Sequence, residues 1–385
     1  MSHQQHPGEE EADARLLIGA SETDANIYYA TRFFAPDPFV YVEVAGATYV
    51  MVSDLELDRA RSEAKVDNVV AQSEWTKKAR ASGLDEPKLL DALDLLLKEL
   101  GVASLMVPGA LGVEYADGLR LRGYEVRVKA GPFFEGRLLK SSEEVEEITR
   151  VLRSTEAALD AAIGAVREAK VAENGALLAS DGGPLTSEAI KRMIGRHLLD
   201  HECLAAHTIV AGGEQAVDPH ERGSGPLRAG EPIVIDIFPR CLTTGYYADI
   251  TRTVIKGPAT DAQRAMYEAI LEAMELAFGR IRDGADAQAI HQAILDLFEA
   301  KGFSTGEQDG RMQGFFHSTG HGLGLEIHEP PRISKAPEIL RAGMVVTVEP
   351  GLYYAGKGGI RVEDIVVVEA DGCRNLTAYP KFLEV

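Results

Sequence analysis

A glycine-rich segment that carries three of the ten histidines constrains this chain more than any other stretch. It runs from His317 to Glu329 and reads HSTGHGLGLEIHE, with a glycine at every second position from 320 to 324. Each glycine would weaken a helix by about 1 kcal/mol relative to alanine, so the segment is predicted to form strand and loop. In an extended strand, residues of equal parity share a face, so His317 and His321 are expected to point the same way, with His328 beyond a turn. Taken alone, the segment could equally be a surface loop with incidental histidines.

Four acidic residues lie beside apolar, strand-like runs in the second half of the chain. They are Asp236 after Ile233–Ile235, Asp249 before Ile250–Thr253, Glu349 after Val345–Val348, and Glu363 shortly before Ile365–Val368. A carboxylate at the end of a buried strand is costly unless a positive charge compensates it. Each acid alone reads as a surface residue at a strand end, but four of them together with His321 favour a shared site.

A pair of divalent cations would compensate these acids. Two metal ions in one site need bridging carboxylates and a few terminal ligands. Two aspartates, two glutamates and one histidine supply that set, which is rich in oxygen and contains no sulfur. Such ligands favour Mn²⁺ or Co²⁺, with Zn²⁺ as a further option.

The composition argues against several classes of binding partner. Lys and Arg number 40 against 60 Asp and Glu, which gives a formal net charge of −20 and disfavours nucleic acid and anionic membranes as partners. The three cysteines, at positions 203, 241 and 373, fit neither a disulfide framework nor a thiolate metal cluster. The sequence shows no signal-peptide pattern and no apolar window of about 18 residues. A cytoplasmic protein is therefore expected.

The length of 385 residues suggests two domains. In the first, strands and helices alternate up to about Arg137, which predicts an α/β fold. The expected elements are a hairpin of strands at 39–44 and 49–52 around Gly46, a helix at 91–100, a strand at 104–107, a helix at 115–121 and a strand at 125–128. Residues 1–15 are expected to be flexible, and His3 and His6 are not expected to be ligands.

The second domain is expected to begin near Lys140. Ser141 and Glu144 form a capping box, after which apolar residues recur at helical spacing over about seven turns. A helix at 186–199 and strands at 207–211 and 233–238 follow; then come helices at 260–281 and 286–300 and strands at 345–348 and 365–368. Two successive helix-helix-strand-strand units suggest an internal duplication whose halves enclose a cleft.

These motifs, in this order, closely resemble those of the pita-bread metallopeptidases. The similarity is carried by Asp236, by Asp249 in YADITRT, by the segment from His317 to His328, by Glu349 in VEPGLY and by Glu363 in GIRVED. Within that family the chain looks most like the prolidase and aminopeptidase P branch. The N-terminal part is similar to the creatinase-type domain that precedes the catalytic domain there. The resemblance implies a creatinase-like α/β domain at 1–138 and an α+β pita-bread catalytic domain at 139–385.

The resemblance also implies roles for single residues. Asp236 and Asp249 would bind one metal, with Asp249 bridging to the second; His321 and Glu349 would complete the second metal's ligands, and Glu363 would bridge both. Glu349 would also act as a proton shuttle. His328 is expected to stabilise the tetrahedral intermediate. His220, the family's first active-site histidine, would line the pocket for the proline end of the substrate with His317 and Arg361.

The implied activity is metal-dependent hydrolysis of Xaa-Pro peptide bonds. An Xaa-Pro dipeptidase (prolidase) is the expected form, and an Xaa-Pro aminopeptidase acting on longer peptides is the alternative. The hairpin tip from Arg240 to Thr244 is expected to intrude on the substrate pocket, which would affect the preferred peptide length. A homodimer is implied by relatives. Creatinase-like hydrolysis without metal fits less well because all five ligand positions can bind metal. An inactive binding module fits less well because no ligand is lost.

Overall fold

The computed structural model describes residues 12–385. These residues divide into two compact units, with the division between Glu135 and Gly136; the predicted boundary is between 138 and 139. The expectations for residues 1–11, including His3 and His6, lie outside the described part. Ala14 and Arg15, which were also expected to be flexible, instead begin strand β1 and pair with Val44 and Glu43 of β2. That pairing satisfies their backbone groups and orders them.

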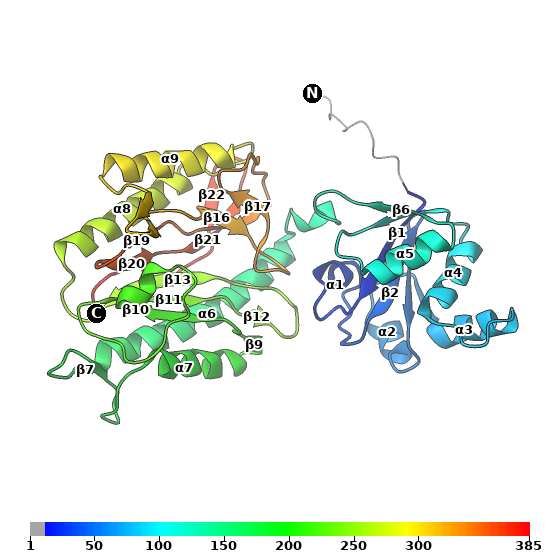
Figure 1. Cartoon of the computed structure of the whole chain (residues 1–385), viewed down its shortest axis with the longest axis horizontal. Coiled ribbons are helices and arrows are strands. Elements are labelled where there is room, and N and C mark those ends of the chain that lie inside the picture. Colours follow the sequence, from blue (N-terminus) through cyan, green and yellow to red (C-terminus); the bar gives the residue numbers. More distant parts are fainter. Residues whose placement is uncertain (1–11) are drawn as a thin grey trace. The chain divides into compact units, whose positions relative to one another are not determined.

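The first unit is a six-stranded mixed sheet with helices on both faces (Figure 1). The strand order is β4 (Asn68–Ala71), β3 (Ala47–Val52), β2 (Phe39–Val44), β1 (Ala14–Gly19), β5 (Ser104–Val107) and β6 (Glu125–Val128). The helices are α1 (Ala25–Thr31), α2 (Leu57–Glu63), α3 (Gln72–Ala81), α4 (Leu89–Glu99) and α5 (Val113–Leu121). One core cluster packs Trp75, Leu93 and Leu119 of α3, α4 and α5 against the sheet, and a second packs Ile27 and Ala60 of α1 and α2.

The predicted hairpin is confirmed as β2 and β3, which pair antiparallel. Ala45 and Gly46 at its turn have φ values of 49° and 81°. Two successive positive φ values give the strands the twist that a two-residue hairpin needs. The structure also contains α1, α2 and α3, which the sequence analysis did not predict, because their short helical patterns lie among strand-like residues.

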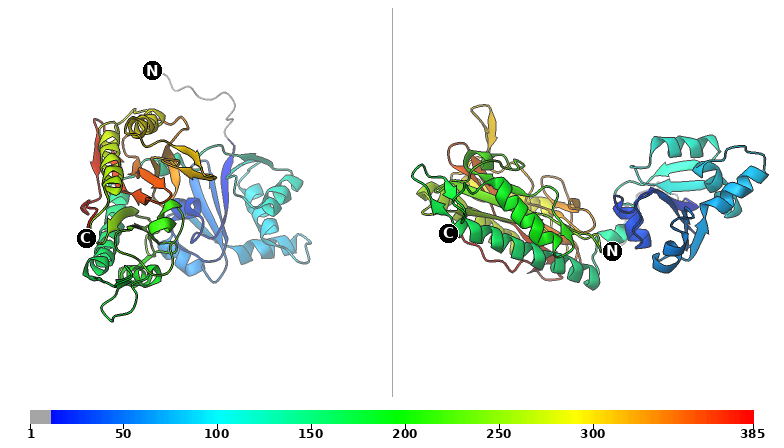
Figure 2. Two further views of the ribbon diagram at one scale, coloured as in Figure 1. Left: turned by 60° about the vertical axis from the view of Figure 1, so that its left-hand side comes forward. Right: turned by 90° about the horizontal axis from the view of Figure 1, so that it is seen from below.

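The second unit places its strands between two helix pairs, α6 with α7 and α8 with α9 (Figures 1 and 2). The helices are α6 (Ser142–Glu168), α7 (Ser187–Leu199), α8 (Asp261–Phe278) and α9 (Ala287–Ala300). One sheet has the order β10 (Ile209–Gly212), β11 (Pro232–Ile237), β13 (Ile250–Ile255). Another has the order β17 (Glu329–Ile333), β16 (Gly320–Gly322), β18 (Val345–Val348), β21 (Asp364–Val368), β22 (Cys373–Asn375). The helix-helix-strand order thus occurs twice, as the sequence indicates.

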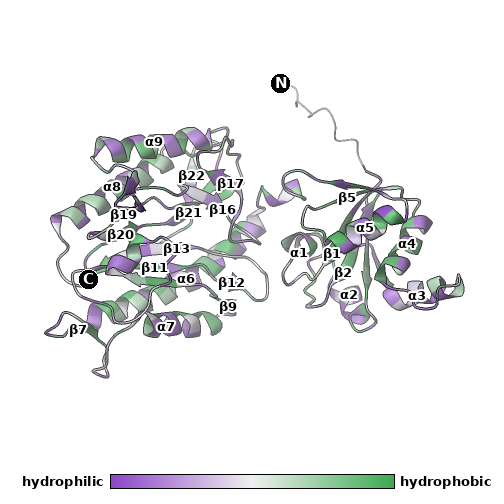
Figure 3. Ribbon diagram, viewed as in Figure 1, coloured by the Kyte–Doolittle hydropathy of each residue, from purple (hydrophilic) through white to green (hydrophobic). Residues whose placement is uncertain are grey.

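Short elements complete the second unit. Three strand pairs are β7 (Lys170–Val171) with β8 (Leu177–Leu178), β9 (Cys203–Leu204) with β12 (Arg240–Cys241), and β14 (Gly306–Gln308) with β15 (Arg311–Gln313). A fourth is β19 (Gly351–Tyr354) with β20 (Gly358–Arg361), and 3₁₀ turns cover η1 (Glu135–Arg137) and η2 (Gly213–Val217). Figure 3 shows that the strands are largely hydrophobic while the helices carry a hydrophilic side. None of the helices in residues 12–385 is both long and apolar enough to cross a membrane.

Helix α6 begins at the predicted capping box. The Ser141 Oγ accepts the Glu144 N–H at 3.3 Å, and the Glu144 carboxylate accepts the Ser141 N–H at 2.9 Å. These bonds satisfy two backbone donors that a helix start otherwise leaves free. The apolar face, including Ile148, Leu152 and Leu159, is buried. The helix therefore supports the sheet that carries Asp236.

Candidate active site

A cavity of about 550 Å³ opens between the two larger sheets of the second unit. All nine residues predicted for the site line it: His220, Asp236, Asp249, His317, His321, His328, Glu349, Arg361 and Glu363. Asp236 and Asp249 come from the β10-β11-β13 sheet, within β11 and just before β13. His321 lies in β16, and Glu349 and Glu363 directly flank β18 and β21 of the other sheet. Two sheets far apart in sequence thus supply one set of ligand-type side chains.

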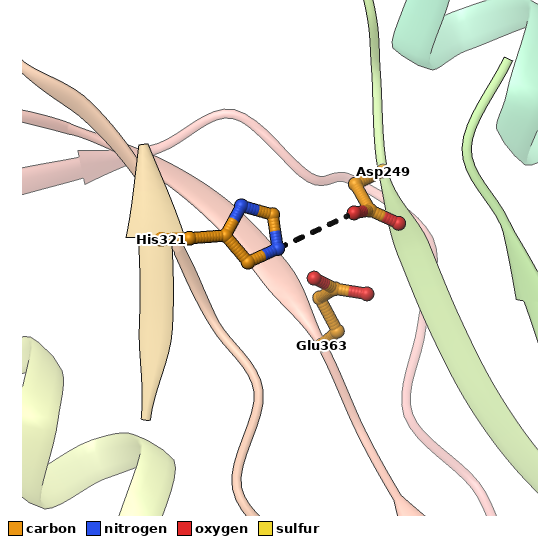
Figure 4. A group of neighbouring side chains, drawn as sticks. All are labelled: Asp249, His321 and Glu363. Atoms are coloured by element: carbon orange, nitrogen blue, oxygen red, sulfur yellow. Dashed lines mark ion pairs between the residues drawn. The ribbon is translucent and has the colours of Figure 1, made fainter. Parts of the chain in front are cut away.

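Three of these side chains form a tight group (Figure 4). One ligand-type atom each from Asp249, His321 and Glu363 lies within 4.8 Å of the others. The His321 Nε2 atom is 3.7 Å from Asp249 Oδ2 and 3.5 Å from Glu349 Oε1. These separations are too long for good hydrogen bonds, and they leave the imidazole nitrogen facing two carboxylates.

The tautomer of His321 follows from its second ring nitrogen. His321 Nδ1 lies 3.2 Å from the Gly322 carbonyl oxygen, which can only accept, so Nδ1 carries the proton. Burial lowers the pKa of His321 to about 3, so the ring is neutral. Its Nε2 atom therefore presents a lone pair to the carboxylates. A metal-binding histidine characteristically donates its other N–H to a backbone carbonyl in this way.

The buried carboxylates are electrostatically unfavourable as they stand. Burial, followed by the neighbouring carboxylates, raises the pKa of Asp249 and of Glu363 well above their usual values. Burial likewise raises the pKa of Glu349 to about 8. Among the described residues, Asp236 is the only one of these four acids with a cation at hydrogen-bond distance. Arg361 Nη2 donates to Asp236 Oδ2 at 2.7 Å. A second source of positive charge would stabilise the group.

The donor atoms fit divalent cations. One oxygen each of Asp236, Asp249 and Glu363 is buried without a hydrogen-bond partner among residues 12–385. Orphaned oxygens of this kind are rare in native proteins and call for an explanation such as an ion. Together with the lone pair of His321, they form the oxygen-rich, single-imidazole set that binds hard or borderline metal ions.

The backbone around His321 and Glu349 is held by close contacts that only glycine permits. The Glu349 N–H donates to the Thr319 carbonyl at 2.8 Å, and the His321 N–H donates to Thr347 Oγ1 at 3.1 Å. A Cβ atom at Gly320 would lie 1.9 Å from the Thr347 carbonyl oxygen. The predicted strand is only Gly320–Gly322, so His317 lies outside it and the shared-face argument for His317 is wrong. Both histidines nevertheless reach the cavity.

A hydrogen-bond chain joins His317 to Asp236. His317 Nδ1 is 2.8 Å from the Ser318 carbonyl, and burial lowers the pKa of this ring to about 3, so Nε2 is an acceptor. Nε2 lies 3.0 Å from the Tyr353 hydroxyl, which receives a bond from Arg361 Nη1 at 2.8 Å. Arg361 thus donates to both Tyr353 and Asp236. Its contact with a substrate stays a prediction.

His328 and His220 lie at the exposed side of the cavity. The His328 ring packs edge-on against His321, with 4.4 Å between ring centroids. Burial, then Arg332, lowers the pKa of His328. The cavity wall includes Phe238, but none of residues 240–244 lines it in the described chain. The hairpin tip expected to intrude on the pocket therefore does not reach it.

Arg332, a cation that lines the cavity, was not predicted from the sequence. Arg332 lies directly opposite His321 in the pairing of β16 with β17, so their side chains share a face. Burial alternates along β17, with Arg332 on its exposed side. No carboxylate partner for Arg332 occurs among the described residues. Its even spacing from His328 was a strand-parity signal that could have revealed it.

A buried ion-pair cluster holds the loop that carries His328. The neighbouring Glu329 accepts from Lys140 Nζ at 2.6 Å and from Arg137 Nη2 at 2.7 Å. The side chains of Lys140 and Glu329 are 3% and 4% exposed. Gly324 packs against this pair, because a Cβ there would lie 2.7 Å from Glu329 Oε1. The cluster therefore fixes the backbone next to a predicted catalytic histidine.

Replacing Lys140 tests how much this ion-pair cluster stabilises the protein. Lys140→Met is expected to lower the free energy of unfolding by about 1–3 kcal/mol, since Glu329 loses one of its two charged donors while remaining buried. Urea unfolding followed by circular dichroism measures the change. Lys301→Met is the matched control: Lys301 pairs with Glu272 at the same 2.6 Å, but at the surface. The control should change stability by less than about 1 kcal/mol, and equal losses in both variants would contradict the anchoring role.

Comparison with known proteins adds independent information. Residues 146–370 match the model of metallopeptidase family M24. An Xaa-Pro dipeptidase of Pyrococcus furiosus is 34% identical over 243 residues, which is 63% of each chain, and one of Pyrococcus horikoshii is 28% identical over 91% of this chain and 90% of its own. The solved structure of the prolidase from Pyrococcus furiosus has a TM-score of 0.76 at 26% identity, covering 96% of this chain and 97% of that chain.

The family match covers more than half of the chain and contains every residue that lines the cavity. The similarity in fold extends over both units, which confirms the predicted two-domain architecture. The buried carboxylates and the neutral imidazole are a donor set that suits metal ions, as expected for an enzyme that uses them to cleave peptides. The chain belongs to metallopeptidase family M24.

Proposed function

We propose that this enzyme is an Xaa-Pro dipeptidase that hydrolyses the bond before proline with the help of two divalent cations. The observation that carries the proposal is the convergence of the His321 lone pair with Asp249, Glu349 and Glu363 in one cavity. Two relatives that bear the name Xaa-Pro dipeptidase support the substrate class.

Five residues would hold the cations: Asp236, Asp249, His321, Glu349 and Glu363. When bound, the cations would polarise the scissile carbonyl and acidify the attacking water. The oxygen-rich set favours Mn²⁺, with Co²⁺ and Zn²⁺ as alternatives. Arg361 supports this set by holding one oxygen of Asp236 at 2.7 Å while the other oxygen faces no partner among the described residues.

The remaining residues would handle protons and the substrate. Glu349 combines a raised pKa of about 8 with a position beside His321, which suits a carboxyl that receives a proton and passes it to the leaving nitrogen. His328 would donate a hydrogen bond to the developing oxyanion. The imide nitrogen of an Xaa-Pro bond has no hydrogen, so the proline ring must be recognised by shape. Phe238 and Phe316 supply apolar wall for it, beside His220 and His317.

Arg332 favours the dipeptidase over the alternative, an Xaa-Pro aminopeptidase. A dipeptide places a free carboxylate directly on the proline, within the cavity, whereas a longer peptide carries an amide there. Arg332 lines that cavity, and its guanidinium has no carboxylate partner among residues 12–385. An arginine fork matches the geometry of a carboxylate. The unpaired guanidinium of Arg332 is therefore suited to binding the C-terminal carboxylate of a dipeptide.

Replacement of Arg332 tests this assignment. With an Xaa-Pro dipeptide, Arg332→Gln is expected to lower kcat/KM by about 30- to 150-fold, equivalent to about 2–3 kcal/mol for a lost charged contact. With an Xaa-Pro-Yaa tripeptide, the same change should cost less than about fivefold. The readouts are kcat and KM for both substrates in the Mn²⁺-loaded enzyme. The control is Arg311→Gln, which removes an exposed arginine paired with Glu214 outside the cavity.

An equal loss on both peptides would contradict carboxylate recognition by Arg332. A wild-type enzyme that cleaves only the tripeptide would favour the aminopeptidase instead. Turnover at the full rate after complete removal of metal would contradict the proposed metal-dependent hydrolysis.

We further propose a homodimer, to be tested by sedimentation, and a cytoplasmic location, which the three free cysteines support.

A further inference from the structure

Two cysteines face each other away from the cavity, on the paired strands β9 and β12. Cys203 and Cys241 are direct partners in the antiparallel register. The Leu242 N–H donates to the Glu202 carbonyl at 2.8 Å, so the neighbouring pair 242 and 202 is the hydrogen-bonded one. The cysteines therefore occupy a non-hydrogen-bonded pair, with side chains on the same face; in such pairs the Cα atoms typically lie about 4.5 Å apart. That spacing lies within the range of about 4.4–6.8 Å that a disulfide spans.

The two thiols have different surroundings. Cys241 Sγ accepts from Arg150 Nη2 at 3.1 Å and lies 3.1 Å from the Thr243 hydroxyl. Cys203 Sγ lies 3.3 Å from the His201 carbonyl oxygen, which cannot donate to it. The contact with Cys203, followed by the hydroxyl groups of Thr243 and Thr244, lowers the pKa of Cys241 to about 3, whereas the same contact and burial raise the pKa of Cys203. Cys241 is thus suited to be the attacking nucleophile in thiol–disulfide exchange, and Cys203 is suited to be the resolving thiol, which attacks the resulting mixed disulfide.

We propose that Cys203 and Cys241 form a reversible dithiol–disulfide pair that reacts with low-molecular-weight disulfides. The Cys241 thiolate attacks one sulfur of the small disulfide, which forms a mixed disulfide and releases one small thiolate. Cys203 then attacks the Cys241 sulfur, the internal bond forms, and the second small thiol leaves with the proton of Cys203. The protein loses two electrons and the proton of Cys203, and the small disulfide is reduced to one thiol and one thiolate, which takes its proton from the solvent.

The pair lies just beneath the surface. Both thiols are buried, but the adjoining Leu204 and Leu242 are 48% and 51% exposed, and the Arg150 side chain is 45% exposed. β9 and β12 contain only two residues each, so a small opening of this edge would admit a reagent. A disulfide between Cys203 and Cys241 would link the segment between Asp236 and Asp249, which contains β12, to β9, the strand that follows α7. The inference does not depend on the proposed peptidase activity.

Oxidised glutathione is the probe for the experiment. In full-length protein with Cys373→Ser, incubation should remove both remaining free thiols. The intact mass should fall by two hydrogen atoms without retained glutathione, and digestion should yield one linked peptide pair containing Cys203 and Cys241. Dithiothreitol should restore both thiols. No linkage under conditions that oxidise a small dithiol, or linkage only between two chains, would overturn the proposal.

Single variants test the order of attack. In the same background, Cys203→Ser should trap one glutathione on Cys241, because the resolving thiol is missing. Cys241→Ser should react at Cys203 at least about tenfold more slowly, since a neutral thiol is a poor nucleophile. Arg150→Met removes the cation that donates to Cys241 Sγ, so the pH at which adduct formation reaches half of its maximal rate should rise. Arg192→Met, on the exposed side of α7, is the control. Faster adduct formation at Cys203 than at Cys241 would reverse the assignment.

Discussion

Asp249→Asn is expected to abolish metal binding and to lower kcat by roughly 10³-fold, equivalent to about 4 kcal/mol of transition-state stabilisation. Asp249 is buried, one of its oxygens has no hydrogen-bond partner within residues 12–385, and the other lies 3.7 Å from His321 Nε2. The amide keeps the size of the side chain but removes its charge. The residual carboxylates would then hold a cation pair too weakly for turnover.

Titration calorimetry and metal analysis of the desalted protein measure the loss. Asp261→Asn is the control, because Asp261 is an exposed aspartate at the start of α8. In excess chelator, the Asp249 variant should melt at or above the temperature of the wild type, since it removes one of several crowded carboxylates. That result would show that the variant is folded. A variant that still binds two equivalents of metal would contradict the ligand assignment.

Arg252→Met is expected to destabilise the protein by about 3–5 kcal/mol, because it removes one of the two cations bound to the buried Asp364, the other being Lys381, and leaves several carbonyl groups without their donor. Arg252 in β13 donates to the Asp364 carboxylate in β21 at 2.9 Å and to the Glu363 carbonyl at 2.6 Å. The two side chains are 2% and 0% exposed. These bonds join the sheet that carries Asp249 to the strand that follows Glu363, so metal affinity should fall as well.

Thermal and urea unfolding, with and without metal, measure this effect. The matched control is Arg264→Met, which breaks a surface pair with Glu384 at 2.7 Å in which both side chains are 43% exposed. The control should cost less than about 1 kcal/mol. Equal stability of the two variants would show that the buried pair does not hold the sheets together.

Local patterns predicted much of the fold. The capping box at Ser141, the hairpin around Gly46 and the β5 strand each depend on residues close in sequence, and the structure contains all three. The five ligand-type residues were also visible, because an acid beside an apolar strand is an unusual placement whose cost needs an explanation. Their roles as ligands stay predictions, although the structure brings them to one cavity.

Long-range partners could not be predicted in the same way. Arg252 meets Asp364 across 112 residues, and Lys140 meets Glu329 across 189. Neither arginine nor lysine shows in the sequence whether its charge is buried. The strand argument for His317 failed because β16 contains only three residues and begins at Gly320, after His317. The tertiary contact of Gly320 with Thr347, and not local preference, sets the course of that segment.

The position of β1 limits how the molecule can be shortened. β1 lies between β2 and β5 in the six-stranded sheet, and the Asp13 carboxylate accepts N–H groups from Ala103 and Ser104. A trimmed version that starts at residue 16 would lose Ala14 and Arg15, the two residues of β1 that pair with β5, and the exposed edge of β5 would invite aggregation. An N-terminal affinity tag or fusion partner should therefore leave residues 13–19 intact.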